Sequence, residues 1–226
     1  MTWVVFIVIA LLAGIIFLSR HSSSHRQTGE QFQKSLEKFL EGKSRLLPGH
    51  LPDAQEAFQI EFQFKGQPFL YEDVPDRGFA QEARKAYLKT GTDTDFTLYF
   101  TEKPRSTTIK TDVIIVSNIP DEPVQQGARV RVPAPLKGLE VQTNNPSLAN
   151  KLLSSDKMVE ILLEFRNVDS RGYPSLALKI LEGTMTLEFH SAEGKVPNYR
   201  AMRGNVSSLE DYLEDLVTLA RFIKTA

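Results

Sequence analysis

The feature that most constrains this chain is an uninterrupted apolar stretch near its N-terminus. Met1 to Ser19 carries no charged side chain, and Trp3 to Leu18 is apolar throughout. A helix of about 18 residues is about 27 Å long, close to the hydrocarbon thickness of a bilayer. We therefore expect residues 1–19 to form a transmembrane helix with Trp3 and Arg20 at the two interfaces. A cleaved signal peptide is the alternative, but a basic n-region and a clear cleavage site are missing.

The charges beside this stretch predict its orientation. The N-terminal side offers only the α-amino group, whereas the C-terminal side carries Arg20, Arg26, Lys34 and Lys38. The positive-inside rule then predicts an outside N-terminus and a cytoplasmic C-terminal domain. The membrane that we expect is a bacterial inner membrane. The small residues Ala10 and Gly14 are four apart, which allows close approach of another helix, although both types are common in spans. The predicted partners are the lipid bilayer and other integral membrane subunits.

The remainder of the chain has the composition of a folded domain. Of the 226 residues, 41% are hydrophobic and 24% are charged, which is enough to build a core. The net charge of -1 gives no reason to expect nucleic-acid binding. Cysteine is absent, which excludes disulfides and thiolate metal sites. We expect a linker and an amphipathic helix over residues 20–50 and an α+β domain over residues 51–226.

Hydrophobic patterning predicts the elements of the first half of this domain. Apolar residues alternate with polar ones from Phe58 to Phe64, which indicates a strand, and Lys65-Gly66 indicates a turn into a short strand from Pro68 to Tyr71. The other expected elements are a loop over Glu72 to Gly78, a short helix over Phe79 to Leu88, a strand over Phe96 to Phe100 and a buried strand over Ile109 to Val116.

The second half repeats this order loosely. Leu176 to Ile180 and Met185 to Phe189 predict a hairpin across Glu182-Gly183, and Ser207 begins an amphipathic C-terminal helix. Residues 54–118 and 127–190 therefore form a weak internal repeat at most. The remaining expected elements are strands at Val130 to Val132 and Leu139 to Val141 and helices from Pro146 and from Asp156. The expected sheet is mixed and mainly antiparallel, with flanking helices.

No motif of catalysis, cofactor binding or metal binding is recognisable. The 13 glycines are scattered, and the four histidines lack ligand spacing apart from His21 and His25 in a serine-rich linker. The acidic residues Glu72, Asp73 and Asp76 allow acid–base chemistry or a Ca²⁺ loop, but they fit a solvated loop better. We therefore expect no catalytic residue, cofactor or metal.

One aromatic and cationic cluster lies before the last helix. Tyr199, Arg200 and Arg203 combine a ring with two guanidinium groups, which suits a partner protein or anionic lipid headgroups. An ordinary exposed loop is the alternative interpretation. The candidate contact residues are therefore Trp3, Ala10, Gly14, Arg20, Tyr199, Arg200 and Arg203.

The domain resembles a loose class of bacterial single-pass membrane proteins with an uncharacterised α+β extramembrane domain. The likeness is carried by the paired strands around Phe62 to Phe69, the stretch from Asn145 to Ala149 before Leu152 to Ser155, the hairpin at Gly183 and the terminal helix. This resemblance implies architecture only.

These observations favour a non-catalytic, membrane-anchored accessory or scaffolding subunit that docks on a larger membrane complex, such as a respiratory or photosynthetic one. The anchor and the lack of recognisable catalytic groups support this interpretation. The alternative is a tethered module that binds a ligand or peptide through its sheet. An enzyme of unrecognised type is the third hypothesis.

Overall fold

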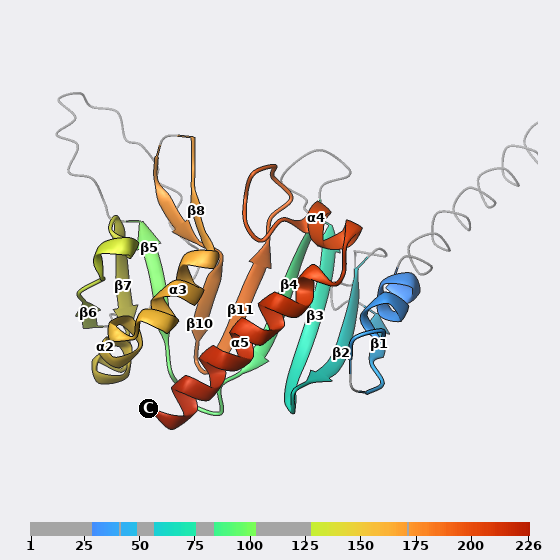
Figure 1. Cartoon of the computed structure of the whole chain (residues 1–226), viewed down its shortest axis with the longest axis horizontal. Coiled ribbons are helices and arrows are strands. Elements are labelled where there is room, and N and C mark those ends of the chain that lie inside the picture. Colours follow the sequence, from blue (N-terminus) through green and yellow to red (C-terminus); the bar gives the residue numbers. More distant parts are fainter. Residues whose placement is uncertain (1–28, 41, 49–56, 76–83, 103–127, 171) are drawn as a thin grey trace, which may run out of the picture. The chain divides into compact units, whose positions relative to one another are not determined.

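The protein is α+β, with antiparallel strands and helices (Figure 1). This computed structural model describes residues 29–40, 42–48, 57–75, 84–102, 128–170 and 172–226. The chain divides into two compact units, the first made of residues 1–90 and 186–217 and the second of residues 91–185 and 218–226. Each unit combines separate stretches of the chain, whereas the weak repeat divides it into consecutive halves, and that repeat stays a prediction.

The structure contradicts the predicted single-pass membrane architecture. Among the described residues, no helix is both long enough and apolar enough to span a bilayer. The longest described helix, α5 (Ser208–Thr225), has an acidic first turn and a basic residue in its last turn, which a span does not tolerate at such density. The apolar residues 1–19 lie outside the described residues. The expected transmembrane helix, single-pass topology and inner-membrane localisation are therefore not supported.

The first unit is built on antiparallel strands with one apolar face. The strands follow the order β1 (Arg45–Pro48), β2 (Phe58–Phe64), β3 (Gln67–Pro75), β4 (Arg84–Gly91) and β11 (Thr184–Phe189). The predicted turn between β2 and β3 is confirmed, because Lys65 and Gly66 both have positive φ, 49° and 78°, as a tight hairpin turn requires.

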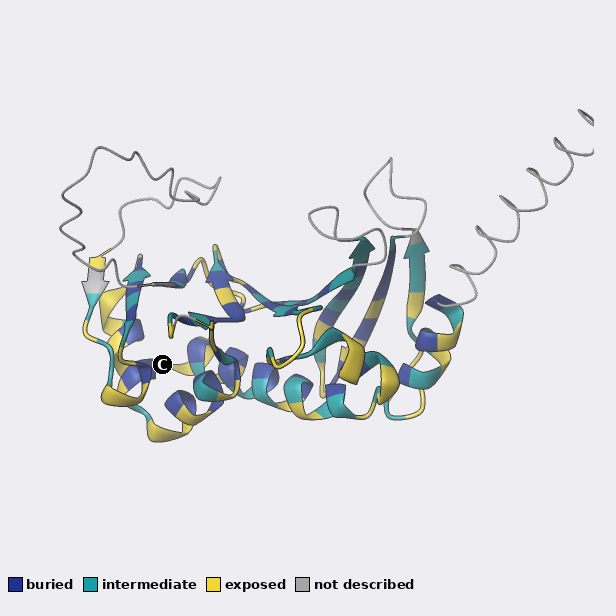
Figure 2. Ribbon diagram, turned by 90° about the horizontal axis from the view of Figure 1, so that it is seen from above, coloured by how far each residue is buried: buried dark blue, intermediate teal, exposed yellow. Residues whose placement is uncertain are grey.

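Helices cover the apolar face of this sheet (Figure 2). Alternate residues of β2 and β3 are buried, among them Phe62 and Tyr71. Glu61 and Gln63, on either side of Phe62 in β2, are exposed. The covering elements are residues 29–36, which are helical, α4 (Tyr199–Gly204) and the first part of α5. The buried side of α5 presents Leu209, Leu213 and Leu216, as its predicted apolar stripe indicated.

Two predictions for this unit are wrong. The strand β3 continues to Pro75, so the expected loop over Glu72 to Gly78 is strand for its first four residues. The expected helix over Phe79 to Leu88 is strand β4 from Arg84 onward, and residues 79–83 lie outside the described residues. Good helix formers occupy this stretch, but pairing with β3 buries Ala86 and Leu88 at alternate positions, and this packing overrides the local preference.

The second unit has its own strands and helices. Its strand order is β10 (Leu178–Leu181), β5 (Leu98–Glu102), β7 (Leu139–Thr143) and β6 (Ala128–Val130), with β8 (Arg166–Val168) and β9 (Pro174–Leu176) as a separate pair. The helices α2 (Pro146–Ser154) and α3 (Asp156–Glu164) lie on one face of this sheet (Figure 2). The predicted start of α2 at Pro146 is confirmed, and the side chain of Asn145 caps it by accepting from the amide of Leu148. The predicted strand over Ile109 to Val116 lies outside the described residues.

The turn before β11 is tightly packed in the second unit. Glu182 and Gly183 have φ of 46° and 76°, which confirms the predicted hairpin turn. A Cβ atom on Gly183 would lie 1.6 Å from the carbonyl oxygen of Thr94, so only glycine fits there. The amide of Thr92 donates to the carbonyl of Gly183 at 2.7 Å, which fixes the turn against the segment before β5.

Candidate functional site

A buried carboxylate is the centre of the polar network in the first unit. Asp73 of β3 is fully buried, and four donor contacts surround it. The Nε and Nη2 atoms of Arg84 lie 2.6 and 2.5 Å from its Oδ1 atom. The hydroxyls of Tyr71 and Tyr199 donate to its Oδ2 atom at 3.1 and 2.9 Å. A carboxylate offers about four lone-pair sites, so these donors saturate Asp73.

Burial and the carboxylate together shift the neighbouring groups. Burial first, and the charge of Asp73 second, raise the pKa of Tyr71 and that of Tyr199, so both phenols stay neutral donors. Burial alone would lower the pKa of Arg84, but the charge and hydrogen bonds of Asp73 outweigh it and raise that pKa. The network therefore joins the buried Asp73 to the half-buried Arg84, and both tyrosines stay protonated over the whole physiological range.

A cation on aromatic rings continues this network. The guanidinium of Arg203 lies 4.5 Å from the ring centroid of Phe32 and 5.8 Å from that of Phe58. The ring of Phe32 is in turn 4.6 Å from that of Tyr71. Cation–π contacts of this kind contribute about 0.5–2 kcal/mol. Arg203 and Tyr199 thus join the short helix α4 to β2, β3 and the helical residues 29–36. We call the group formed by Asp73, Arg84, Tyr71, Tyr199 and Arg203 the buried clamp.

The structure places the candidate residues of the sequence in three different settings. Tyr199 and Arg203 belong to the buried clamp, in a short helix rather than the expected loop. Arg200 lies between them and is exposed. Trp3, Ala10, Gly14 and Arg20 lie outside the described residues. Contact of any of these seven with a partner stays a prediction.

The clamp was missed because Asp73 was assigned to a solvated acidic loop. That assignment is wrong for Glu72 and Asp73, which are strand residues, while Asp76 lies outside the described residues. The signal was present, since Asp73 follows Phe69 and Tyr71 at a spacing of two and so falls on the buried face. A carboxylate at such a position needs donors, and the sequence does not say which residues supply them.

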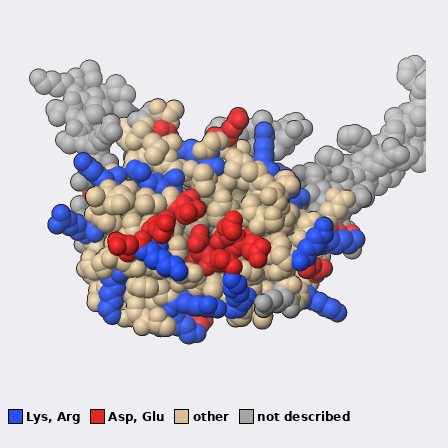
Figure 3. All heavy atoms as spheres, in the orientation of Figure 1, with Lys and Arg blue, Asp and Glu red and all other residues tan. Residues whose placement is uncertain are grey.

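Acidic side chains gather on the face of the molecule that α5 covers (Figure 3). In the first unit these include Glu210, Asp211, Glu214 and Asp215, at the start of that helix. Carboxylates near a helix N-terminus are stabilised by the helix dipole, and Glu214 pairs with Lys65. The helix itself therefore accounts for this cluster.

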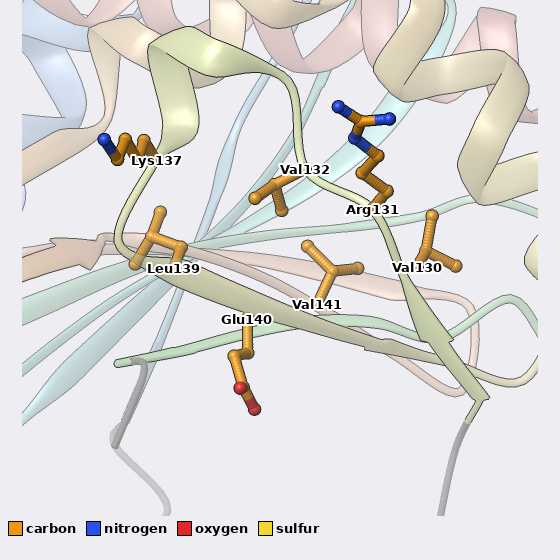
Figure 4. Close-up of a pocket in the computed structure, with 7 residues that line it drawn as sticks. All are labelled: Val130, Arg131, Val132, Lys137, Leu139, Glu140 and Val141. Carbon is orange, nitrogen blue, oxygen red and sulfur yellow. The ribbon is translucent and has the colours of Figure 1, made fainter. Parts of the chain in front are cut away.

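A hollow of about 500 Å³ lies beside the sheet edge in the second unit (Figure 4). It opens where residues 131–138 leave β6, form a single 3-10 turn and return as β7. Aliphatic side chains of Val132, Leu139 and Val141 lie between the loop and the strand. Its lining residues are Val130, Arg131, Val132, Lys137, Leu139, Glu140 and Val141.

Two cations flank this hollow. Arg131 and Lys137 extend from the loop on opposite sides of the aliphatic side chains, and Glu140 points away from them (Figure 4). Both cations are exposed, and within the described part of the chain no hydrogen bond or ion pair joins either to another residue. We call this arrangement the basic groove. It presents positive charge that has no partner among the described residues, next to apolar surface.

A second hollow of about 390 Å³ adjoins the basic groove. It shares Arg131 and Val132 with the first, so these two residues form the wall between them. Beyond that wall it is lined by Pro133, Ala134, Asn150, Leu153 and Ser154.

Sequence reasoning did not find the basic groove. Its local cause is readable, because Pro133 and Pro135 end strand β6 and lift the chain away from the sheet. Leu136, which is fully buried, then anchors the raised loop. The pairing of β6 with β7, which places Val130 opposite Val141, depends on tertiary structure and has no local signature.

The described residues offer no group of three or more histidine, aspartate or glutamate side chains placed to hold a metal ion. Comparison of the chain with known protein families, curated proteins and solved structures finds no match.

Proposed function

We propose that this chain is a non-catalytic docking protein that binds an extended, acidic and partly apolar segment of a partner protein in the basic groove. The observation that carries this proposal is that Arg131 and Lys137, on either side of an aliphatic hollow, are exposed and have no partner in the part of the chain that the structure describes. A ligand complementary to this surface has apolar side chains for the hollow and carboxylates for the cations.

The position of the groove at a sheet edge favours a peptide as this ligand. Strand β6 pairs with β7 on one side, and none of the described strands pairs with its other side. An extended segment can add to such an edge through main-chain hydrogen bonds while alternate side chains enter pockets. In the first unit, by contrast, the edge strand β1 contains Pro48 and the charged Arg45, which discourage such pairing.

The state of the buried clamp supports a binding role over a catalytic one. Two contacts from Arg84 and one from each tyrosine hydroxyl occupy the carboxylate oxygens of Asp73, so no acceptor site of Asp73 is left for a substrate. Its tyrosines have raised pKa values and are poor bases or nucleophiles at neutral pH. The clamp therefore acts as a structural support, whereas the groove offers unused charge.

The test is a charge-swap binding experiment on the full chain. Fluorescence anisotropy would measure binding of a labelled Ser-Leu-Glu-Leu-Glu-Leu-Ser peptide, capped at both ends, and of its counterpart with Lys in place of Glu. We expect the acidic peptide to bind better, and the double variant Arg131→Glu/Lys137→Glu to weaken it by about tenfold or more, as two exposed charge pairs predict. The same variant should bind the lysine peptide better than the unaltered chain does.

Lys157→Glu is the matched control. Lys157 is an exposed cation of α3 in the same unit that does not line either hollow, so this change alters the net charge equally per site. If Lys157→Glu loses half as much binding free energy as the double groove variant, which changes twice the charge, the effect reduces to net charge and contradicts the proposal. Absence of binding by the acidic peptide to the unaltered chain would also contradict it.

A further inference from the structure

The boundary between the two hollows suggests which side chains of a bound peptide the basic groove can distinguish. Arg131 and Val132 line both hollows, so the guanidinium stands between two separate spaces. The first space is aliphatic, and the second combines the buried Leu153 with the polar Asn150 and Ser154 of α2. A ligand that follows the groove past Arg131 therefore meets apolar surface on both sides of one cation.

We propose that the basic groove recognises an apolar–acidic–apolar tripeptide unit, with the carboxylate on Arg131 and one apolar side chain in each hollow. This inference rests on the function proposed above and specifies its ligand. The first and third side chains of an extended tripeptide point to the same side, so the two apolar side chains can each enter one hollow. The acidic side chain between them points away from the hollows, where the exposed side chain of Arg131, which lines both, can reach it.

Asn150 is the specificity-determining residue of the second hollow. It is exposed, and among the described residues its side-chain amide has no hydrogen-bond partner. The Oγ atom of Ser154, one turn later, instead donates to the carbonyl of Lys151. A side-chain amide both donates and accepts, so Asn150 can pair with the main chain of a bound peptide as a strand neighbour would.

The experiment compares capped peptides on the full chain by fluorescence anisotropy. The first probe has Leu-Glu-Leu between Gly-Ser flanks, two further probes replace one or the other Leu by Gly, and a fourth replaces Glu by Gln. We expect each Leu→Gly change to weaken binding by about tenfold and Glu→Gln by about fivefold. Asn150→Ala should weaken all probes that fill the second hollow by about fivefold, the effect of one lost hydrogen bond.

Ala134→Trp isolates the second hollow. Ala134 is exposed and lines only this hollow, so a large ring there fills the space without touching the core. The Leu-Glu-Leu probe should bind this variant only as tightly as one of the two Leu→Gly probes binds the unaltered chain. The affinity of that Leu→Gly probe should be the same for the variant and the unaltered chain. This coupling is the signature of one side chain in one hollow.

The outcomes separate the two proposals. Binding that depends on Arg131 but responds neither to Ala134→Trp nor to the second Leu would overturn the tripeptide unit and leave acidic docking intact. Failure of every acidic probe to bind the unaltered chain would overturn both. Binding of the Gln probe as tight as that of the Glu probe would remove the role given to Arg131.

Discussion

The two units of this protein use charge in opposite ways. In the first, the fully buried Asp73 and the half-buried Arg84 lie 2.5 Å apart at their closest atoms, and two tyrosine hydroxyls also contact Asp73. In the second, Arg131 and Lys137 are exposed and have no partner among the described residues. A paired buried charge holds a fold together, because removing one partner leaves the other without solvent or counter-charge. An unpaired exposed charge contributes little to folding and remains available to a ligand.

The largest expected effect is on the buried pair. Asp73→Ala should lower the free energy of unfolding by about 3–5 kcal/mol, because Arg84 and two tyrosine hydroxyls lose their acceptor in a buried site. Urea denaturation followed by circular dichroism measures this change. If the variant does not fold, the milder Asp73→Asn should still show a loss, since its amide nitrogen faces donors where an acceptor is needed.

An exposed ion pair in the second unit provides the matched control. Asp93 and Lys224 also lie 2.5 Å apart, but their side chains are 67% and 63% exposed. Asp93→Ala should therefore change stability by less than about 1 kcal/mol. Equal losses for the two aspartates would show that burial does not distinguish them, and the comparison between the units would fail.

A smaller effect on the free energy of unfolding is expected at alkaline pH. Burial raises the pKa of Tyr71 and Tyr199, so the folded state keeps both protons where an unfolded tyrosine begins to ionise, at a pH of about 10. The contribution of these two protons to the free energy of unfolding is complete below that pH. It is lost as the pH rises toward the folded pKa, by up to about 1.4 kcal/mol per pH unit for each tyrosine.

The variant Tyr199→Phe isolates one of these protons. The stability advantage of the unaltered chain over the variant should be constant between about pH 7 and 9 and should shrink by about 1 kcal/mol by about pH 11. Urea denaturation at each pH, on both proteins, gives this difference. An advantage that persists unchanged through pH 11 would mean that Tyr199 is not held in its neutral form by the clamp.

Local patterns predicted those parts of the fold whose cause is local. The turn residues Lys65-Gly66 and Glu182-Gly183 specify hairpins by their positive φ, and Asn145-Pro146 specifies a helix start. The clamp required knowledge of which face of β3 is buried and of how β4 and α4 supply its donors. Strand β4 in particular contradicts its own helical preference, because pairing with β3 decides its conformation.

The basic groove shows the same limit more strongly. Pro133 and Pro135 indicate that the chain leaves the sheet, but the hollow exists only because Val130 lies opposite Val141 in the register of β6 and β7. Whether a cation has a partner depends on its surroundings in the folded chain, so no sequence pattern states that Arg131 and Lys137 have none among the described residues. Functional surfaces of this kind are therefore visible only once the strands are paired.

The smallest expected effect completes the comparison. The double variant Arg131→Ala/Lys137→Ala should change the free energy of unfolding by less than about 0.5 kcal/mol, because exposed side chains without partners contribute little to folding. Removal of two neighbouring positive charges can even stabilise the unit slightly by relieving repulsion. Urea denaturation at neutral pH of this double variant and of Asp73→Ala gives the two changes in unfolding free energy under the same conditions. A loss of more than about 1.5 kcal/mol in the free energy of unfolding would mean that these cations stabilise the loop over residues 131–138. Their exposure would then be explained by folding and would not indicate a binding role.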